Sequence, residues 1–147
     1  MKSRTILLVE DNPKDELLTR RSLKRQFQFD DIVVAHDGQE ALDLLFGTEQ
    51  QAPISPTLVL LDLRLPKIGG HEILKRIRNN PRTRLLPVVI LTSSDEEVDI
   101  LNGYEEGANS YVKKPIMTDD FAAAVQNLGL FWLTTNIAPT VDGYDDE

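Results

Sequence analysis

Three short, uninterrupted apolar runs constrain the fold of this chain more than any other feature of its sequence. They are ILLV at 6–9, LVLL at 58–61 and VVIL at 88–91, and a polar residue follows each of them. A strand with one solvated face alternates apolar and polar residues, so continuous runs are typical of parallel strands that are covered on both faces. The runs therefore predict a parallel sheet with helices on both sides.

Amphipathic stretches separate five predicted strands. The strands are expected at Thr5–Val9, Ile32–Ala35, Leu58–Leu61, Val88–Leu91 and Ser110–Val112. The helices are expected at Pro13–Gln26, Gln39–Phe46, Gly70–Asn79, from Ser94 or Asp95 to Gly107, and at Thr118–Leu133. Five β-α units in this order predict an α/β, doubly wound, flavodoxin-like fold with an extended C-terminal helix. In such folds the functional site lies beyond the carboxyl ends of the strands.

The length of 147 residues suits a single domain. We expect this domain to span 1–138 and the acidic tail at 139–147 to be disordered. The chain has no cysteine, which excludes disulfides and thiolate metal sites. No apolar run approaches the ~20 residues of a membrane span, and the first run is too short for a signal peptide, so we expect a cytoplasmic protein without membrane contact. The net charge of −8 argues against direct binding of nucleic acid.

Charged and hydroxyl side chains follow four of the predicted strands. Glu10 and Asp11 follow the first strand, Asp62 the third, Thr92 the fourth and Lys114 the fifth. Because the carboxyl ends of parallel strands meet at one edge of the sheet, these side chains should converge. Each residue alone is weak evidence, since acidic residues and lysines are usually solvated surface groups. Their joint placement is what indicates a functional site.

Such a cluster of carboxylates favours a bound cation. Neighbouring carboxylates repel one another, and a cation between them relieves that repulsion. Mg²⁺ is a hard ion that prefers oxygen ligands, and Mn²⁺ has similar preferences and could substitute for it. Three carboxylates (−3), one Mg²⁺ (+2) and one lysine (+1) sum to zero. The metal and the lysine could hold phosphoryl oxygens while a carboxylate attacks phosphorus in line.

Four stretches resemble, in the same order, the receiver domains of bacterial response regulators. They are ILLVEDNP, LVLLDLRLPKIGG, VVILTSS and GANSYVKKP, and the resemblance extends over residues 4–133. It implies the receiver fold, with Asp62 as the phosphoacceptor. The metal ligands that it implies are Glu10, Asp11, Asp62 and the main-chain carbonyl of Arg64.

The same resemblance implies the residues that answer phosphorylation. Thr92 would be the switch hydroxyl, Lys114 the phosphate-binding lysine and Tyr111 the switch aromatic residue. The peptide bond before Pro115 would be cis, an isomer found in only ~5–6% of X–Pro bonds. Arg64 departs from the family pattern, since many receivers have a smaller residue there, and this puts access to the acyl phosphate in doubt.

A narrower resemblance is to stand-alone response regulators associated with bacterial, notably cyanobacterial, phytochromes. It depends on DNPKDELLTRRSLK, LRLPKIGGHEIL, TSSDEEVDI and the late FWL. It implies a two-component phosphorelay in which a sensor histidine kinase, here a phytochrome, is the partner that phosphorylates Asp62. The response would pass on through protein contacts, and the chain would catalyse only its own phosphorylation and dephosphorylation.

The last predicted helix carries an apolar surface beyond its core stripe. Leu130, Phe131 and Leu133 fall outside that stripe. Large apolar residues gathered on a surface helix indicate a partner, and we expect a homodimer. The alternative is an extended tail that folds back over the domain.

Two other functions stay open on the same fold. A metal-dependent phosphatase with an aspartate nucleophile usually has a second aspartate two residues later, where this chain has Arg64. A flavin-binding electron carrier needs a hydroxyl- and glycine-rich phosphate loop after the first strand. The sequence there is EDNPKDE, whose carboxylates would repel a phosphate.

Overall fold

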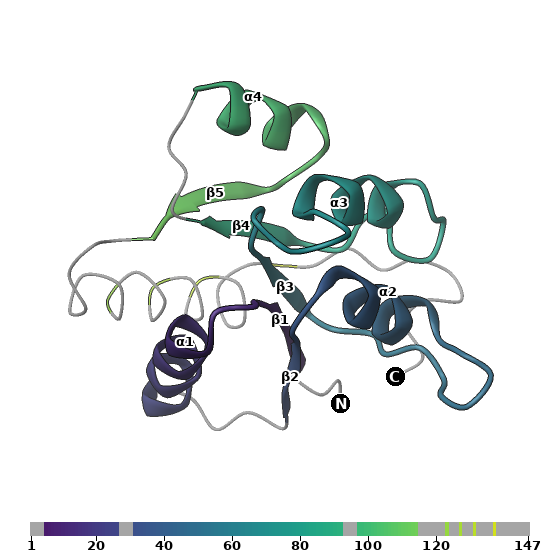
Figure 1. Cartoon of the computed structure of the whole chain (residues 1–147), viewed down its shortest axis with the longest axis horizontal. Helices are drawn as coiled ribbons and strands as arrows, with labels where there is room; N and C mark the ends of the chain where they lie inside the picture. The colour runs from purple at the N-terminus through teal and green to yellow at the C-terminus, as the bar shows by residue number, and fades with distance from the viewer. Residues whose placement is uncertain are drawn as a thin grey trace.

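Five parallel strands form a single sheet in the order β2-β1-β3-β4-β5 (Figure 1). This structure, a computed structural model, describes residues 5–26, 31–92 and 97–114, together with the single residues 123, 127, 131 and 137. The strands are β1 (Thr5–Val9), β2 (Asp31–Ala35), β3 (Leu58–Leu61), β4 (Val88–Thr92) and β5 (Ser110–Lys113). The order reverses direction between β1 and β3, and in doubly wound sheets the ligand site lies at that reversal.

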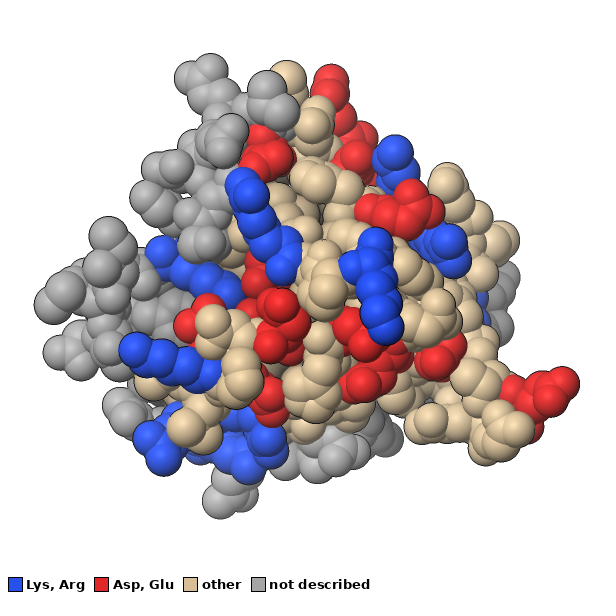
Figure 2. Space-filling view, in the orientation of Figure 1, with Lys and Arg blue, Asp and Glu red and all other residues tan. Residues whose placement is uncertain are grey.

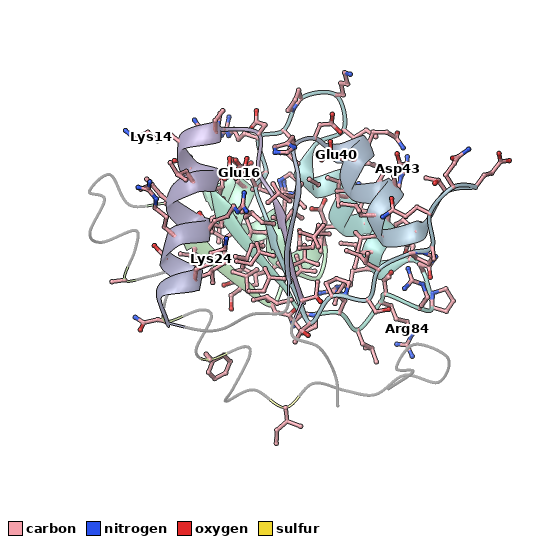
Figure 3. All side chains as sticks on the ribbon, turned by 90° about the horizontal axis from the view of Figure 1, so that it is seen from below. Lys14, Glu16, Lys24, Glu40, Asp43 and Arg84 are labelled. Atoms are coloured by element: carbon pink, nitrogen blue, oxygen red, sulfur yellow. The ribbon has the colours of Figure 1, made fainter. Side chains whose placement is uncertain are left out.

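Helices cover both faces of the sheet, as the sequence predicts. They are α1 (Pro13–Gln26), α2 (Gly38–Phe46), α3 (Gly70–Arg78) and α4 (Glu97–Glu105). Figure 3 shows α1 and α2 on opposite sides of the strands, with Lys14 and Glu40 towards the same end. Helix α4 lies over β4 and β5, where Gly103 packs against Ile90 and Tyr111. None of the helices described here is long and apolar enough to cross a membrane.

Alternate residues of the central strands face the two layers of helices. In β1, Ile6 and Leu8 pack in one cluster with Leu23 of α1. Leu7 and Val9 pack in the other cluster, with residues of α2 and α3. Every residue of the three apolar runs is buried. Each large apolar side chain buried in this way contributes ~1.5–3 kcal/mol, so the three central strands hold the two layers together.

The predicted elements are confirmed within the described residues, with small differences at their ends. Strands β4 and β5 each extend one residue further than predicted, to Thr92 and Lys113, because these two residues pair with each other. Helix α3 ends at Arg78, one residue earlier than predicted, and Asn79 caps it by donating its main-chain N–H to the Lys75 carbonyl. The predicted cap of α4, the fifth helix apart from residues 123, 127 and 131, the acidic tail and the Lys114–Pro115 peptide bond lie outside the described residues.

Candidate functional site

Glu10, Asp11 and Asp62 meet at the carboxyl ends of β1 and β3. One carboxylate oxygen from each lies within 4.8 Å of the others. Glu10 and Asp62 are 1% and 6% exposed, whereas Asp11 is exposed to solvent. The site is therefore a buried pair of carboxylates with one exposed carboxylate at its mouth. Figure 2 shows that Asp and Glu side chains gather near the middle of the face in view, with Lys and Arg on either side.

Main-chain hydrogen bonds hold the two acidic strand ends in place. The Glu10 N–H donates to the Ala35 carbonyl at 2.9 Å, and the Asp62 N–H donates to the Val9 carbonyl at 3.1 Å. Sheet pairing thus continues one residue past the strands and fixes the main-chain positions from which these two side chains extend. Carboxylate oxygens in such a cluster are the ligands that Mg²⁺ or Mn²⁺ prefers.

Lys114 is the basic centre of this cluster. Its Nζ lies 2.7 Å from Glu10 Oε1, 2.8 Å from Asp15 Oδ2 and 3.2 Å from Asp62 Oδ2. The lysine side chain is only 9% exposed. Its main-chain N–H donates to the Thr92 carbonyl at 2.6 Å, which extends the pairing of β4 with β5 up to the site.

Asp15 is a member of this cluster that the sequence reasoning missed. It lies in the first turn of α1, where the Asn12 side chain caps the helix by accepting from the N–H groups of Lys14 and Asp15 at 2.9 and 3.1 Å. Side chains in the first turn of a helix lean back towards its N-terminus, which here adjoins the acidic strand end. The available signal was the short spacing from the capping residue Asn12 to Asp15.

Burial and neighbouring charges shift the pKa values of Glu10 and Lys114, which lie side by side in this cluster. Burial raises the pKa of Glu10 to about 7, and the hydrogen bond from Lys114 offsets only part of this effect. Burial alone would lower the pKa of Lys114, but its hydrogen bonds to Asp15 and Glu10 outweigh burial and raise the pKa above its usual range. At neutral pH the lysine is charged, while the Glu10 carboxyl is close to its pKa and is partly protonated.

If Glu10 binds Mg²⁺ as the sequence predicts, a proton and the metal compete for its carboxylate, and the metal affinity should depend on pH. The pKa of Glu10 is raised to about 7, so the carboxyl binds a proton below neutral pH and must release it to bind metal. We expect Mg²⁺ affinity to fall up to about tenfold per pH unit as the pH falls from about 7 to 6. Calorimetric titrations between about pH 6 and pH 8 measure this. Glu10→Gln should flatten the dependence, and an equally steep profile in that variant would contradict the assignment to Glu10.

Arg64 connects the loop after β3 to α4. Its main-chain N–H donates to Asp62 Oδ1 at 3.1 Å, so the loop itself orients the Asp62 carboxylate. Its guanidinium donates to Asp99 Oδ2 on α4 at 3.2 Å, and the arginine side chain is 59% exposed. The pair bridges the β3–α3 loop and α4, which are far apart in sequence. The coordination of a metal by the Arg64 carbonyl stays a prediction.

The β3–α3 loop packs so closely against two glycines that neither position has room for a side chain. A Cβ on Gly70 would lie 2.4 Å from the Asp62 carbonyl oxygen, and one on Gly38 would lie 2.5 Å from the Ile68 carbonyl oxygen. Within the β3–α3 loop, Lys67 has a φ of 66°, in the left-handed region. The β3–α3 loop is therefore packed against α2 and α3, and a larger residue at Gly70 would displace the main chain of Asp62.

The predicted switch residues lie on the strands next to the site. Thr92 is fully buried at the end of β4. Tyr111 is half-buried on β5 and pairs with Ile90. A Cβ on Gly103 of α4 would lie 3.3 Å from the Tyr111 ring, so this ring lies directly under α4.

The predicted association surface is described only in part. Phe131 is 47% exposed, while Leu130 and Leu133 lie outside the described residues. Helix α4 also exposes two large apolar side chains, Leu101 and Tyr104. Residues three apart lie on one side of a helix, so these two share a face.

Comparison with known proteins shows which family the chain resembles. The response regulator receiver domain matches residues 6–126. FilR2 of Methanothrix harundinacea, named a probable methanogenesis regulatory protein, is 40% identical over 91% of this chain and 86% of its own length. The response regulator Rcp1 of Synechocystis is 38% identical over 92% of this chain and 93% of its own. Its Mn²⁺-bound crystal structure matches with a TM-score of 0.83, over 93% of this chain and 99% of that one, at 37% identity.

A phosphorylated structure also matches. The phosphorylated cyanobacterial phytochrome response regulator RcpA superposes with a TM-score of 0.89, covering 95% of this chain and 100% of its own, at 34% identity. Together with the strand order, this likeness confirms the doubly wound receiver fold predicted from the apolar runs.

Proposed function

This chain belongs to the response regulator receiver domain family, and from that premise we propose that Asp62 accepts a phosphoryl group from a sensor histidine kinase. The observation that carries the proposal is the position of Lys114, whose Nζ lies 3.2 Å from Asp62 Oδ2 beside the carboxylates of Glu10 and Asp11. In this proposal the Asp62 carboxylate is the acceptor, the Lys114 ammonium is a fixed cation, and the neighbouring carboxylates supply oxygen ligands for a metal. The Mn²⁺-bound structure of the similar Rcp1 supports a divalent ion, and we propose Mg²⁺.

The proposed transfer uses Asp62 as the nucleophile. A carboxylate oxygen of Asp62 attacks the phosphorus of a phosphohistidine, the P–N bond breaks, and its electron pair stays on the imidazole nitrogen, which can take up a proton. The product is an aspartyl phosphate. Lys114 would hold one phosphoryl oxygen, and the Arg64 N–H, which donates to Asp62 Oδ1 at 3.1 Å, keeps the carboxylate aligned. The bound metal would neutralise charge on the other phosphoryl oxygens.

Incubation with acetyl phosphate and Mg²⁺ tests the proposal against the alternatives. A receiver should gain one phosphoryl group per chain, seen by intact-mass measurement, and release it slowly. A phosphatase would release phosphate continuously. Arg64 stands where aspartate-based phosphatases usually place a second aspartate, which favours the receiver. We further propose that catalysis is limited to the chain's own phosphorylation and dephosphorylation, and that the protein acts in the cytoplasm, where its kinase domain partner would be.

For the upstream partner we propose a phytochrome kinase. The support is the likeness to RcpA, a phytochrome response regulator, over 95% of this chain. FilR2, a similar protein named a probable methanogenesis regulatory protein, leaves another sensor kinase as the alternative. A phosphotransfer assay with purified, phosphorylated kinases decides between them. Faster transfer from a kinase without a photosensory module would overturn the phytochrome assignment.

Thr92→Ala should separate phosphorylation from response. Thr92 is fully buried beside Lys114 at the end of β4. We propose that its hydroxyl donates to a phosphoryl oxygen, and a hydrogen bond to a charged group contributes ~1.5–3 kcal/mol net. The variant should still be phosphorylated, but the phosphorylation-induced NMR shifts of Tyr111 should shrink. Shifts of equal size in Thr92→Ala and wild type would contradict this coupling.

We also propose that the chain associates with itself. The support is apolar exposure: Leu101 and Tyr104 on α4, and Phe131, each expose about half of the side chain or more. A symmetric dimer would bury each such patch twice. Sedimentation should show a dimer at tens of micromolar, and replacing Phe131 and Leu133 by Asp should give a folded monomer that still accepts phosphate. A monomeric wild type, both with and without phosphate, would assign this surface to another protein.

A further inference from the structure

Three carboxylates form ion pairs with the ammonium group of Lys114. Glu10, Asp15 and Asp62 each place an oxygen 2.7–3.2 Å from Nζ. A lysine ammonium has three N–H donors and no more. An arriving phosphoryl oxygen can therefore bind Lys114 only if one of these carboxylates gives up its hydrogen bond.

The three carboxylates differ in their other duties. Glu10 and Asp62 belong to the acidic cluster that would hold a metal, and Asp15 does not. Asp62 is also the proposed acceptor, so its charge becomes part of the acyl phosphate. Asp15 has no such duty, and among the described residues the ion pair that the structure shows for its carboxylate is with Lys114. Its side chain is 29% exposed, so water can solvate it once Lys114 moves away.

We infer that Asp15 is a positioning residue that holds Lys114 before phosphorylation and competes with the phosphoryl group for its ammonium. This inference rests on the proposed function. Helix α1 makes the competitor rigid, because the Asp15 N–H is capped by Asn12 Oδ1 at 3.1 Å. A carboxylate fixed in this way withdraws the lysine from incoming anions without closing the site.

Asp15 also changes the charge of the site. Glu10, Asp11, Asp15 and Asp62 give −4 when ionised, and one divalent metal with Lys114 gives +3, so the metal-loaded site carries −1. The net charge of zero that the sequence predicts for the metal-loaded site counts three carboxylates and leaves out Asp15. An anionic group therefore meets a site that repels it slightly, and both the net charge and the competition for Lys114 weaken its binding.

Beryllofluoride, a small anionic mimic of a phosphoryl group on a carboxylate, tests the inference in the full-length chain with saturating Mg²⁺. Asp15→Asn should bind it about five- to tenfold more tightly than wild type, because one negative charge near the ammonium is gone. Acetyl phosphate should also phosphorylate Asp15→Asn faster. Asp15→Glu keeps the charge on a side chain one methylene longer, which can still reach Lys114, and it should resemble wild type.

The matched control is Glu16→Gln. Glu16 is the next residue of the same helical turn, and it pairs with Arg20 at 3.3 Å and His36 at 3.1 Å. Its replacement removes the same charge from the same turn without freeing Lys114. We expect a change in beryllofluoride affinity of less than about twofold. An equal gain in Glu16→Gln and Asp15→Asn would overturn a specific role for Asp15.

A second background separates competition for the lysine from a general effect of charge. In a Lys114→Met chain, Asp15→Asn should give a clearly smaller gain, since no ammonium is left to release and only the change in net charge remains. A gain of the same size in that background, or no gain in the wild-type background, would overturn the inference. Absence of any beryllofluoride binding or acyl phosphate in wild type would instead overturn the proposed function, and this inference with it.

Discussion

Asp62→Asn is expected to abolish phosphorylation by acetyl phosphate while the chain stays folded. The amide keeps the size of the carboxylate, so the buried position stays filled and the Arg64 N–H keeps an oxygen acceptor. Lys114 retains its ion pairs with Glu10 and Asp15. What the variant loses is the nucleophile, since an amide oxygen attacks phosphorus far more weakly than a carboxylate.

Intact-mass measurement after incubation with acetyl phosphate and Mg²⁺ reads this result directly. Asp43→Asn is the matched control, because it makes the same change on α2, where the Asp43 side chain accepts a hydrogen bond from Gln39 at 2.9 Å. The control should gain one phosphoryl group as wild type does. An undiminished phosphoryl adduct in Asp62→Asn, with a circular dichroism spectrum like that of wild type, would refute the acceptor.

Asp11→Ala should lower Mg²⁺ affinity by about 100-fold or more. Loss of groups that merely support a ligand already costs about 10–100-fold in metal affinity, and Asp11 is proposed as a ligand itself. Asp11 is exposed, so its replacement leaves no cavity. Removing one of several neighbouring carboxylates also relieves repulsion, and the metal-free variant should melt no lower than wild type.

Calorimetric titration with Mg²⁺ measures this affinity, and the phosphorylation rate should fall in parallel at low Mg²⁺. Excess Mg²⁺ should restore part of the rate, because Glu10 and Asp62 still supply oxygen ligands. Asp43→Ala again serves as the control with normal affinity. The metal assignment fails if Asp11→Ala binds Mg²⁺ as wild type does, or if a chelator leaves the wild-type rate unchanged.

The sheet was predictable because its central strands are buried on both faces. Such burial leaves an uninterrupted apolar run in the sequence, as in ILLV and LVLL, and these runs lie in β1 and β3, where every one of their residues is buried. Once parallel strands are assumed, their carboxyl ends share one edge, so Glu10 and Asp62 converge without further information. The shared edge of the parallel strands is enough to predict that Glu10 and Asp62 lie close together. No sequence signal that links the two residues directly is needed.

Contacts that depend on how helices sit on the sheet were not predictable in the same way. Asp15 reaches Lys114 from 99 residues away, and Arg64 reaches Asp99 from 35 residues away. Both pairs depend on the direction of a helix axis, which apolar periodicity leaves undetermined. The fit of Gly70 against the Asp62 carbonyl is equally invisible in the sequence, because a glycine there could as well serve a turn.

The central claim, that Asp62 carries the phosphoryl group, is tested most directly by locating the modified residue. Borohydride reduces an aspartyl phosphate to homoserine, and fragmentation of the peptide that spans 58–70 shows which residue changed. After treatment of wild type with acetyl phosphate and Mg²⁺, we expect homoserine at position 62 and nowhere else. Homoserine at Asp11 or Asp15, with Asp62 unchanged, would contradict the account.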